Sequence, residues 1–342
     1  MKKYLLPKEG QFYKANLHMH TTVSDGKMTL AETKEEYQKR GYSIVAFTDH
    51  EVMLPHEDLT DDKFLAITSV EYACNRQTRV NDFSDVTAVH INFYSPEPNR
   101  TTSPVFSEPR FWIEHSKQYV TDEMRKTDYK MYYGVDHINH MIRLGNEAGF
   151  LVSYNHPVWS LQNYPEYAGL EGVWGVEVHN TGCAIAGYPD TTVPLDDLLR
   201  QGKRVVPLAT DDAHSFKDCF GGFTMIKAKE LSYPTVFDAM KKGDLYASTG
   251  PEIYDLYIED GEVHISCSPA AEIMLTTDRR YAGVKKATQG PLTEATFGLK
   301  GFFHQNEEIL AKTDHKPYIR ITVKDASGAC AYTRAYFYDE LQ

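Results

Sequence analysis

Nine histidine and carboxylate residues occupy similar places along the sequence, each at the end of a short apolar run or just past one. They are His18, His20, Asp25, His50, Glu71, His90, His156, Asp212 and His214. Imidazole nitrogens and carboxylate oxygens are common ligands of divalent transition-metal ions. Because α/β barrels carry their functional side chains at strand ends, we expect the nine residues to meet in one metal site.

Two pairs of these residues have the spacing that brings neighbouring side chains together. One residue separates His18 from His20, and one separates Asp212 from His214. Side chains two positions apart along a strand point to the same face, so each pair can place two ligand atoms on one ion. Glu71 is the best candidate for a bridging ligand, because its two carboxylate oxygens can contact two cations.

A single member of this set would carry little weight. The chain has fourteen histidines, and a lone histidine such as His90 or His156 is more often a packed or surface residue than a ligand. The repeated placement at strand ends, together with the two closely spaced pairs, favours metal binding over chance.

Up to about residue 248, segments of strand character alternate with segments of helical character, which predicts parallel strands with helices outside them. Strands are expected at residues 14–20, 43–47, 64–71, 87–94, 151–154, 173–179 and 205–210. Helices are expected at residues 30–41, 135–149, 195–202 and 234–243. About seven strands fit a β/α barrel better than an open sheet.

From Thr249 onward the pattern changes to that of an antiparallel sheet. Asp260-Gly261 lies between two strand-like runs and predicts a hairpin turn. Apolar and polar residues alternate from Ile319 to Lys324, with the two-residue period of a strand. We therefore expect a β/α barrel over residues 1–248 and a small all-β sandwich domain over residues 249–342.

Residues 95–134 fit neither pattern and carry many aromatic residues among charged ones. One interpretation is an insertion that covers the mouth of the barrel. The other is an ordinary packed connection. The sequence does not separate the two.

Composition argues against several kinds of partner. The formal net charge of −12 opposes strong nucleic-acid or anionic-membrane binding, both of which need clustered lysine and arginine. No apolar run is long enough to span a membrane. Five scattered cysteines without a CxxC motif favour a reducing compartment, and the N-terminus has no signal-peptide pattern. We expect a cytoplasmic protein unless a leader precedes this sequence, and the oligomeric state stays open.

The motifs that carry the nine residues resemble those of the PHP (polymerase and histidinol phosphatase) family, in order and roughly in spacing. They are HMHTTVSDG (18–26), FTDH (47–50), SVEYA (69–73), AVHINFY (88–94), YNHP (154–157) and TDDAH (210–214). The resemblance covers about residues 14–230. Two departures are Asn155, where the family often has alanine, and Thr210-Asp211, where Gly-Ser is common.

This resemblance implies a distorted seven-stranded β/α barrel with three divalent ions of manganese, iron or zinc. Carried over by position, the first ion is held by His18, His20, Glu71 and Asp212. The second is held by Glu71, His90 and His156, and the third by Asp25, His50 and His214. The string YASTGPEI (246–253) before the C-terminal strands is similar to sandwich-bearing members grouped with carbaryl-type hydrolases.

The expected chemistry is hydrolysis of a small phosphate ester by a metal-bound hydroxide. Three carboxylates and three divalent ions would leave the site with a charge of about +3, which favours an anionic, phosphorylated substrate. One alternative is hydrolysis of a carbamate, amide or carboxylic ester by the same metals. Another is a metal-binding interaction module without catalytic activity.

Three further residues are secondary candidates. Arg76 and Arg79 follow Glu71 toward the face where substrate would arrive, and a guanidinium can bind phosphate through two hydrogen bonds. His179 ends an apolar run and could support a metal ligand or carry a proton. The alternative for all three is an ordinary polar residue at the rim.

Overall fold

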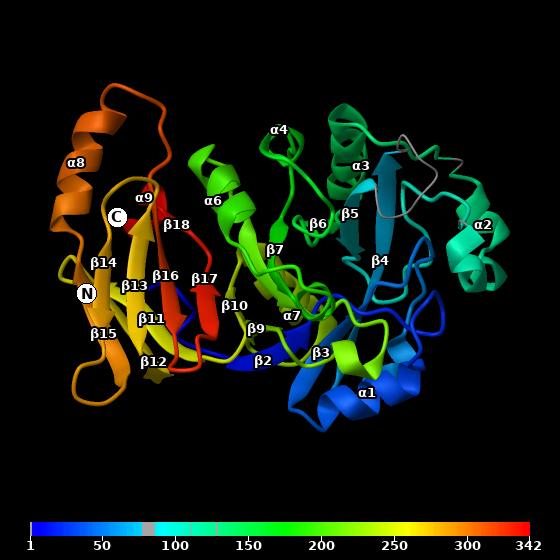
Figure 1. The fold of residues 1–342 in the computed structure, drawn as a ribbon, viewed down its shortest axis with the longest axis horizontal. Coiled ribbons are helices and arrows are strands. Elements are labelled where there is room, and N and C mark those ends of the chain that lie inside the picture. Colours follow the sequence, from blue (N-terminus) through cyan, green and yellow to red (C-terminus); the bar gives the residue numbers. More distant parts are fainter. Residues whose placement is uncertain (1, 77–85, 110, 128) are drawn as a thin grey trace.

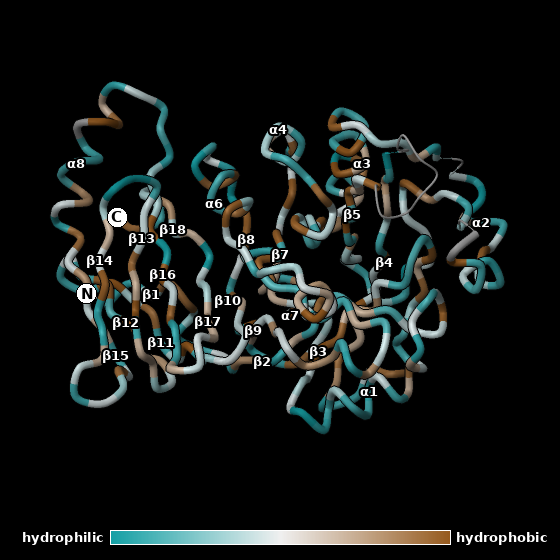
Figure 2. The backbone as a smooth tube through the Cα atoms, viewed as in Figure 1, coloured by the Kyte–Doolittle hydropathy of each residue, from teal (hydrophilic) through white to brown (hydrophobic). Residues whose placement is uncertain are grey.

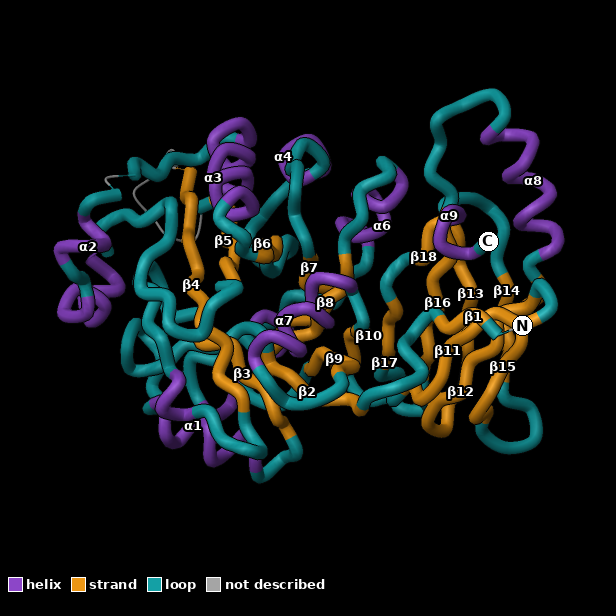
Figure 3. Tube along the Cα trace, turned by 180° about the vertical axis from the view of Figure 1, so that it is seen from behind, coloured by secondary structure: helices purple, strands orange, loops and turns teal. Residues whose placement is uncertain are grey.

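The computed structural model describes residues 2–76, 86–109, 111–127 and 129–342. The strands form one large mixed sheet and one smaller antiparallel sheet, with helices along the outside (Figure 1). Seen from behind, α2 (Asp122–Arg125) and α8 (Lys300–Leu310) lie at opposite sides of the molecule, and α7 (Tyr233–Lys242) lies near its middle (Figure 3). The chain is a mixed α/β protein, as expected from the sequence.

The part of the fold that carries the nine residues follows the expected order of elements. Its strands are β2 (Gln11–Asn16), β3 (Tyr42–Phe47), β4 (Leu65–Arg76), β5 (Thr87–Tyr94), β6 (Leu151–Tyr154), β7 (Gly175–Asn180) and β8 (Val206–Thr210). Its longer helices are α1 (Leu30–Gln38), α3 (Val135–Glu147), α6 (Val193–Arg200) and α7 (Tyr233–Lys242). Shorter helices are η1 (Glu57–Leu59), η3 (Phe111–Tyr119), α2 (Asp122–Arg125), α4 (Tyr164–Tyr167), α5 (Thr181–Ile185) and η4 (Phe216–Asp218).

Local sequence explains where α1 begins. The Thr29 hydroxyl accepts a hydrogen bond from the Glu32 backbone N–H at 3.2 Å, and the Glu32 carboxylate accepts one from the Thr29 N–H at 2.9 Å. This capping box satisfies two backbone donors that a helix start leaves unpaired.

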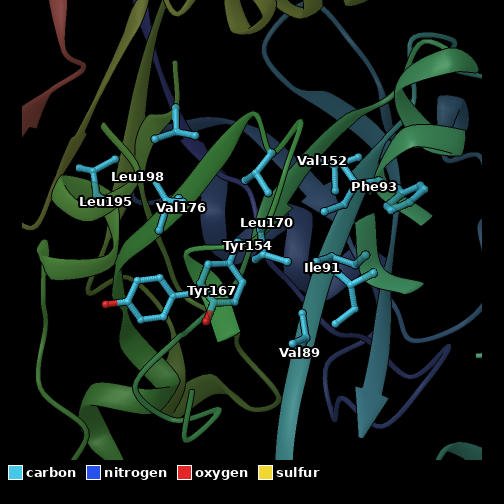
Figure 4. Packing of buried hydrophobic residues seen from close by; sticks show 14 of the residues in the cluster. Val89, Ile91, Phe93, Val152, Tyr154, Tyr167, Leu170, Val176, Leu195 and Leu198 are labelled. Carbon is cyan, nitrogen blue, oxygen red and sulfur yellow. The ribbon is translucent and has the colours of Figure 1, made fainter. Parts of the chain in front are cut away.

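A hydrophobic core lies between these strands and the helices α3 and α6 (Figure 4). Its members on strands and helices include Val89, Ile91, Phe93, Val152, Tyr154, Val176, Ile138, Ile142, Leu195 and Leu198. Gly145 allows α3 to approach β5 closely, because a Cβ there would lie 2.6 Å from the ring of Phe93. An alanine at this position would therefore have to push the helix and the strand apart.

One strand departs from the expected parallel arrangement. Within β2–β8 the neighbouring pairs β2–β3, β3–β4, β6–β7 and β7–β8 are parallel, whereas β5 is antiparallel to both β4 and β6. The expectation of uniformly parallel strands is wrong at β5. Only residues 77–86 separate it from β4, fewer than the dozen or more residues that a parallel crossover needs.

The two ends of this run of strands meet beyond β2 and β8. Among the described residues no ladder pairs these strands directly. Past their ends, the Asp212 N–H donates to the His18 carbonyl at 2.9 Å, and the His20 N–H donates to the Ala213 carbonyl at 3.2 Å. A single parallel bridge joins Met19 to Ala213. The segments that carry four of the nine residues are thereby held side by side.

The C-terminal strands form two packed sheets. The smaller sheet contains β1 (Lys3–Tyr4), β11 (Ile253–Glu259), β12 (Glu262–Ala270) and β15 (Leu292–Gly298). The large sheet continues here with β10 (Leu245–Ser248), β13 (Glu272–Thr277), β14 (Gly283–Lys286), β16 (Tyr318–Lys324), β17 (Cys330–Thr333) and β18 (Tyr336–Phe337). Residues from both sheets share one buried core. The sequence did not predict α8 (Lys300–Leu310), and α9 (Tyr338–Leu341) follows β18.

The hairpin expected at Asp260-Gly261 joins β11 to β12 with a two-residue turn, because Glu259 pairs with Glu262. Both turn residues have positive φ, 52° for Asp260 and 78° for Gly261. This is the turn geometry that asparagine or aspartate followed by glycine favours, and its twist matches that of the strands.

The large sheet runs through the position where a domain boundary was expected. Strand β10 pairs with β17 on one side and with β9 (Phe223–Ala228) on the other. The N-terminal strand β1 pairs with β11, so residues from the start of the chain belong to the smaller sheet. The division at residue 248 stays a prediction, and the backbone on its two sides is joined by sheet hydrogen bonds.

Within residues 95–134, the described part packs against the loops that carry Asp25 and His50. Phe106, Ile113 and Met124 are buried. The Ser116 hydroxyl donates to the backbone carbonyls of His50 at 3.1 Å and of Val23 at 3.3 Å.

Hydropathy follows this layout. Hydrophobic stretches lie along the inner strands, whereas α1 and many outer loops are hydrophilic (Figure 2). Across the described ranges, the helices all fall short of the length and apolarity needed to cross a bilayer.

Candidate metal centre

The nine residues selected from the sequence converge in three overlapping groups. The groups are His18, His20, Glu71 and Asp212; Glu71, His90 and His156; and His20, Asp25, His50 and His214. Within each group, one ligand atom per residue lies within 4.8 Å of every other. His20 thus belongs to two groups, whereas the family resemblance assigned it to the first alone.

Neighbouring strands bring these side chains to one place. His18 and His20 follow β2, His50 follows β3, His156 follows β6, and Asp212 and His214 follow β8. Glu71 and His90 lie inside β4 and β5, which continue past the site as a two-stranded ribbon. The expectation that every member ends a strand is therefore wrong for Glu71 and His90, because β4 and β5 keep pairing on both sides of these residues.

Distances in the first group match the spacing of ligands around one ion. The His18 Nε2 atom lies 3.2 Å from both Glu71 Oε1 and Asp212 Oδ1. The His20 Nε2 atom lies 3.1 Å from Asp212 Oδ1 and 3.3 Å from Glu71 Oε2. Metal–ligand bonds of about 2.0–2.1 Å with tetrahedral or octahedral angles place neighbouring ligand atoms about 2.9–3.4 Å apart.

Glu71 belongs to the first two groups and also contacts His50 of the third. Its Oε1 atom lies 3.2 Å from His90 Nδ1 and 3.4 Å from His156 Nε2. Its Oε2 atom lies 3.3 Å from His50 Nδ1. One carboxylate therefore faces five histidines, which is the position of a bridging ligand.

The third group is more open than the others. Asp25 lies 3.5 Å from His214 Nε2 and 3.8 Å from His50 Nε2. The side chains of Asp25 and His214 are 31% and 39% exposed, whereas those of His18 and His20 are fully buried. Solvent reaches the centre from this side.

Burial and charge act against each other at the centre. Burial lowers the pKa of His20, but hydrogen bonds and charge from Asp212 and Glu71 outweigh it and raise that pKa to about 10. The pKa of His18 is raised well above its ordinary value by the same balance. Without metal these imidazoles hold protons, and ligation requires that the protons leave.

The carboxylates show the opposite shift. Burial alone would raise the pKa of Glu71 and Asp212, but the surrounding histidines hold both pKa values well below their usual range. His50 differs from His20, because burial and the charge of His20 lower its pKa to about 3. The Asp212 Oδ1 atom is buried, and the His18 and His20 Nε2 atoms, at 3.2 and 3.1 Å, do not meet it in good hydrogen-bond geometry. A cation in the first group would satisfy that oxygen, so the donor set fits a transition metal.

Sequence reasoning missed Glu177, which supports two members of the set. It is 2% exposed on β7. Its Oε1 atom accepts hydrogen bonds from His18 Nδ1 and from the Thr210 hydroxyl, both at 2.7 Å. Its Oε2 atom accepts one from the His156 backbone N–H at 2.8 Å. A carboxylate on the far nitrogen of an imidazole fixes its tautomer and directs the other nitrogen to the ion.

Two other residues hold the centre in place. Asn155 donates from Nδ2 to Glu71 Oε1 at 2.9 Å, so this departure from the family pattern contacts the bridging carboxylate. Asp49 accepts hydrogen bonds from the Thr21 N–H at 2.7 Å and the Ser24 hydroxyl at 2.6 Å, which orders the turn before Asp25. Each stands directly before a predicted ligand, Asn155 before His156 and Asp49 before His50, and this position is the signal that could have indicated them.

Backbone strain is concentrated at the same place. His156 has φ of 26° and Asp212 has φ of 49°. Left-handed backbone is costly for residues other than glycine and persists where the surrounding structure enforces it, often at functional sites.

A cavity of about 440 Å³ opens above the three groups. Seven of the nine residues line it, together with Trp159, Leu161, Tyr188, Cys183 and side chains of β4 and β5. Its volume falls in the range of about 300–1,000 Å³ that is usual for small-molecule sites.

Arg76 and His179 do not line this cavity. Arg76 makes an ion pair with Glu166 at 3.1 Å and donates to the Thr87 hydroxyl at 2.9 Å. His179 is hydrogen-bonded through Nδ1 to Asp190 at 2.8 Å and through Nε2 to the Thr181 hydroxyl at 3.0 Å. Arg79 lies outside the described residues. The substrate and supporting roles of these residues stay predictions.

Comparisons with known proteins give likenesses of fold. No protein-family model and no curated protein matches the sequence. A solved two-domain protein from Bacteroides vulgatus, described as containing a predicted PHP-like metal-dependent phosphoesterase, is 15% identical, with a TM-score of 0.46 and 98% of each chain covered. A lesion-specific endonuclease from Pyrococcus furiosus is 19% identical, with a TM-score of 0.40, 68% of this chain and 56% of that chain covered.

An amidohydrolase from Chromobacterium violaceum, solved with sulfate and no metal, is 15% identical, with a TM-score of 0.34. The comparison covers 59% of this chain and 88% of that one. These structures include the family that the sequence motifs resemble.

Proposed function

We propose that this protein is a metal-dependent hydrolase whose three side-chain groups each hold a divalent transition-metal ion. The position of Glu71 carries the proposal, because one buried carboxylate faces five histidines from all three groups. Manganese, iron and zinc all accept such mixed nitrogen and oxygen ligands. A protein that only presents a binding surface to a partner does not need nine converging metal ligands, so this number favours an enzyme.

Bound ions would lower the pKa of a water molecule toward neutrality and offset negative charge on an ester group. The protein supplies the rest. Glu177 keeps a proton on Nδ1 of His18, so that its Nε2 atom faces the cluster. Asn155 orients the carboxylate of Glu71. The buried first group keeps bulk water away, whereas Asp25 and His214 face the open side.

Phosphate esters are the proposed substrates. The nine ligands carry three carboxylates, so three divalent ions would give the centre a net positive charge of about +3 that favours an anionic group. Small substrates suit the cavity of about 440 Å³. The acidic chain, with a net charge of −12, is unfavourable for long nucleic acids.

The proposed architecture is a distorted seven-stranded β/α barrel followed by a small β-sandwich. The bridge between Met19 and Ala213, which joins the ends of β2 and β8, supports a barrel of strands β2–β8. The shared core of the two C-terminal sheets supports a sandwich.

The proposal is tested by metal content and by paired substrates. We expect about three equivalents of manganese or zinc to bind, and the loaded protein to hydrolyse p-nitrophenyl phosphate. Glu71→Gln should abolish turnover, whereas Glu35→Gln on the exposed face of α1 should not change it. A large preference for p-nitrophenyl acetate would favour the carboxylic-ester or carbamate alternative. No turnover of either would favour a non-catalytic module.

A further inference from the structure

The cavity has one wall of small side chains. Strands β4 and β5 continue past Glu71 and His90 as a paired ribbon, with Ala73 opposite His90. Alternate residues of this ribbon line the cavity, among them Ala73 and Ala88. Because side chains two positions apart share a face, these alanines lie on the same side as Glu71 and His90. The residues next to Glu71 and His90 on this wall therefore have short side chains, and Asn75 and Val86 line it farther along the ribbon.

Much of the remaining wall is apolar and partly aromatic, although Asp218 also lines it. Trp159, Leu161, Cys183 and Tyr188 line it. The Trp159 ring lies edge-to-face against His156 at a centroid distance of 4.9 Å and against His90 at 5.4 Å. These two contacts fix the indole directly beside the group of Glu71, His90 and His156. Leu161 is 45% exposed at the same cavity.

These lining side chains favour an apolar group over a polar or charged one as the part of an ester that lies next to the metal centre. A polar or charged group placed against Trp159 and Ala88 would lose water without gaining a hydrogen bond from those side chains. A flat ring would instead bury apolar surface on both sides and could stack on the indole. Most polar groups that line the cavity belong to the metal centre, and the others are Asn75, Tyr188 and Asp218.

We propose that the cavity recognises an ester of a small aromatic alcohol, with the ring held between the β4–β5 ribbon and Trp159. The ester group would then lie at the metal centre. The reaction rests on the proposed function, whereas recognition of the ring can be measured without turnover.

Binding of two phosphonates to the manganese-loaded protein tests this inference. Phenylphosphonate and methylphosphonate share the anionic group and differ in the ring, and neither has a leaving group whose reactivity would bias the comparison. By calorimetry we expect phenylphosphonate to bind about tenfold more tightly, which corresponds to about 1.4 kcal/mol. Trp159→Ala and Ala88→Leu should each reduce this ratio below about threefold.

The two variants act in opposite ways, one by removing a wall and the other by filling the space. Methylphosphonate affinity and metal content should stay unchanged in Ala88→Leu, which shows that the centre is intact. Tyr254→Ala, at an exposed tyrosine on β11, is the matched control and should keep the full ratio.

Equal affinities for the two phosphonates, or no measurable binding of either, would overturn the inference. A tenfold preference for phenylphosphonate that persists in both Trp159→Ala and Ala88→Leu would also overturn it. Ring preference without hydrolysis of any ester would overturn the proposed function and leave the ring site standing. Ester hydrolysis with equal phosphonate affinities would overturn the ring site alone.

Discussion

The Nδ1 atom of His18 lies 2.7 Å from Oε1 of Glu177, and both side chains are almost completely buried. The other oxygen of Glu177 accepts the backbone N–H of His156, whose φ is positive. One carboxylate on β7 therefore supports a residue of the first ligand group and a residue of the second. A register shift in the β7–β8 pairing falls between Glu177 and His179, and such bulges often re-aim side chains beside functional sites.

Replacing Glu177 should weaken two of the three metal sites. In Glu177→Gln the side-chain oxygen can still accept the hydrogen bond from His18. The NH₂ group that replaces the other oxygen is a donor, so it cannot accept the hydrogen bond from the His156 N–H. Loss of such a partner typically costs about 10–100-fold in metal affinity. We expect this loss at the groups of His18 and His156, with binding retained at Asp25, His50 and His214. Competition titration with a chelator, combined with metal analysis, measures it.

The control is a glutamate that contacts none of the nine residues. Glu35 is 66% exposed on α1, and Glu35→Gln should bind all ions as the wild type does. If Glu177→Gln keeps wild-type affinity and stoichiometry, Glu177 has no positioning role. Retained affinity would not affect the assignment of the nine ligands.

Removal of Asp25 should affect the open group alone. Asp25 contacts His20, His50 and His214, and its pKa is held well below its usual range by those histidines despite burial. Asp25→Asn should therefore lose one equivalent of metal, and the two sites that share Glu71 should remain occupied. Metal analysis after gel filtration checks the stoichiometry. Loss of all three equivalents would show that the groups do not fill independently.

Metal-free protein should lose stability as the solution becomes alkaline. The pKa of His20 is about 10 in the folded state, against about 6.5 for an ordinary histidine. Its contribution to the free energy of unfolding is therefore complete below about pH 6.5 and disappears as the pH rises through 10. Urea unfolding of chelator-treated protein between pH 6.5 and pH 10 measures the decline.

Comparison with His20→Gln isolates the contribution of His20 to the free energy of unfolding. The other groups that titrate between pH 6.5 and pH 10 are present in both proteins. The variant should show a smaller decline over these pH values than the wild type. An equal slope in the two proteins would contradict the assignment of the proton to His20.

The candidate site could be predicted because its signals are local. A spacing of two residues is enough to predict that two side chains lie on the same face of a strand, as for His18 and His20 or for Asp212 and His214. Glu177 could not be recognised in the same way, since its partners are 159 and 21 residues distant in the chain. The supporting role of this carboxylate can be recognised only once the folded structure places it next to His18.

The fold shows the same division between local and distant information. Hydrophobic period and turn residues located most strands, including the Asp260-Gly261 hairpin. The pairing of Tyr246 in β10 with Thr333 in β17 depends on contacts between distant segments, and neither strand specifies its partner. The reversal of β5 likewise follows from the short connection after Arg76, which limits the crossovers available.

A buried ion pair joins helix α6 to the C-terminal strand β16. Arg320 on β16 donates from Nε and Nη2 to the two carboxylate oxygens of Asp196 on α6, at 2.9 and 2.8 Å. Their side chains are 8% and 15% exposed. Asp196→Ala leaves the guanidinium buried without its partner, and we expect a loss of about 3 kcal/mol in the free energy of unfolding. Urea denaturation with an unchanged slope measures it.

An exposed ion pair gives the matched comparison. Arg204 contacts Asp339 at 2.6 Å, and their side chains are 50% and 68% exposed. Because solvent screens such a pair, Asp339→Ala should cost less than about 1 kcal/mol. Similar losses in the two variants would mean that burial of the Arg320–Asp196 pair does not set its contribution. A large loss in the free energy of unfolding for Asp196→Ala, with a small loss for Asp339→Ala, would show that the Arg320–Asp196 pair stabilises the contact between α6 and β16.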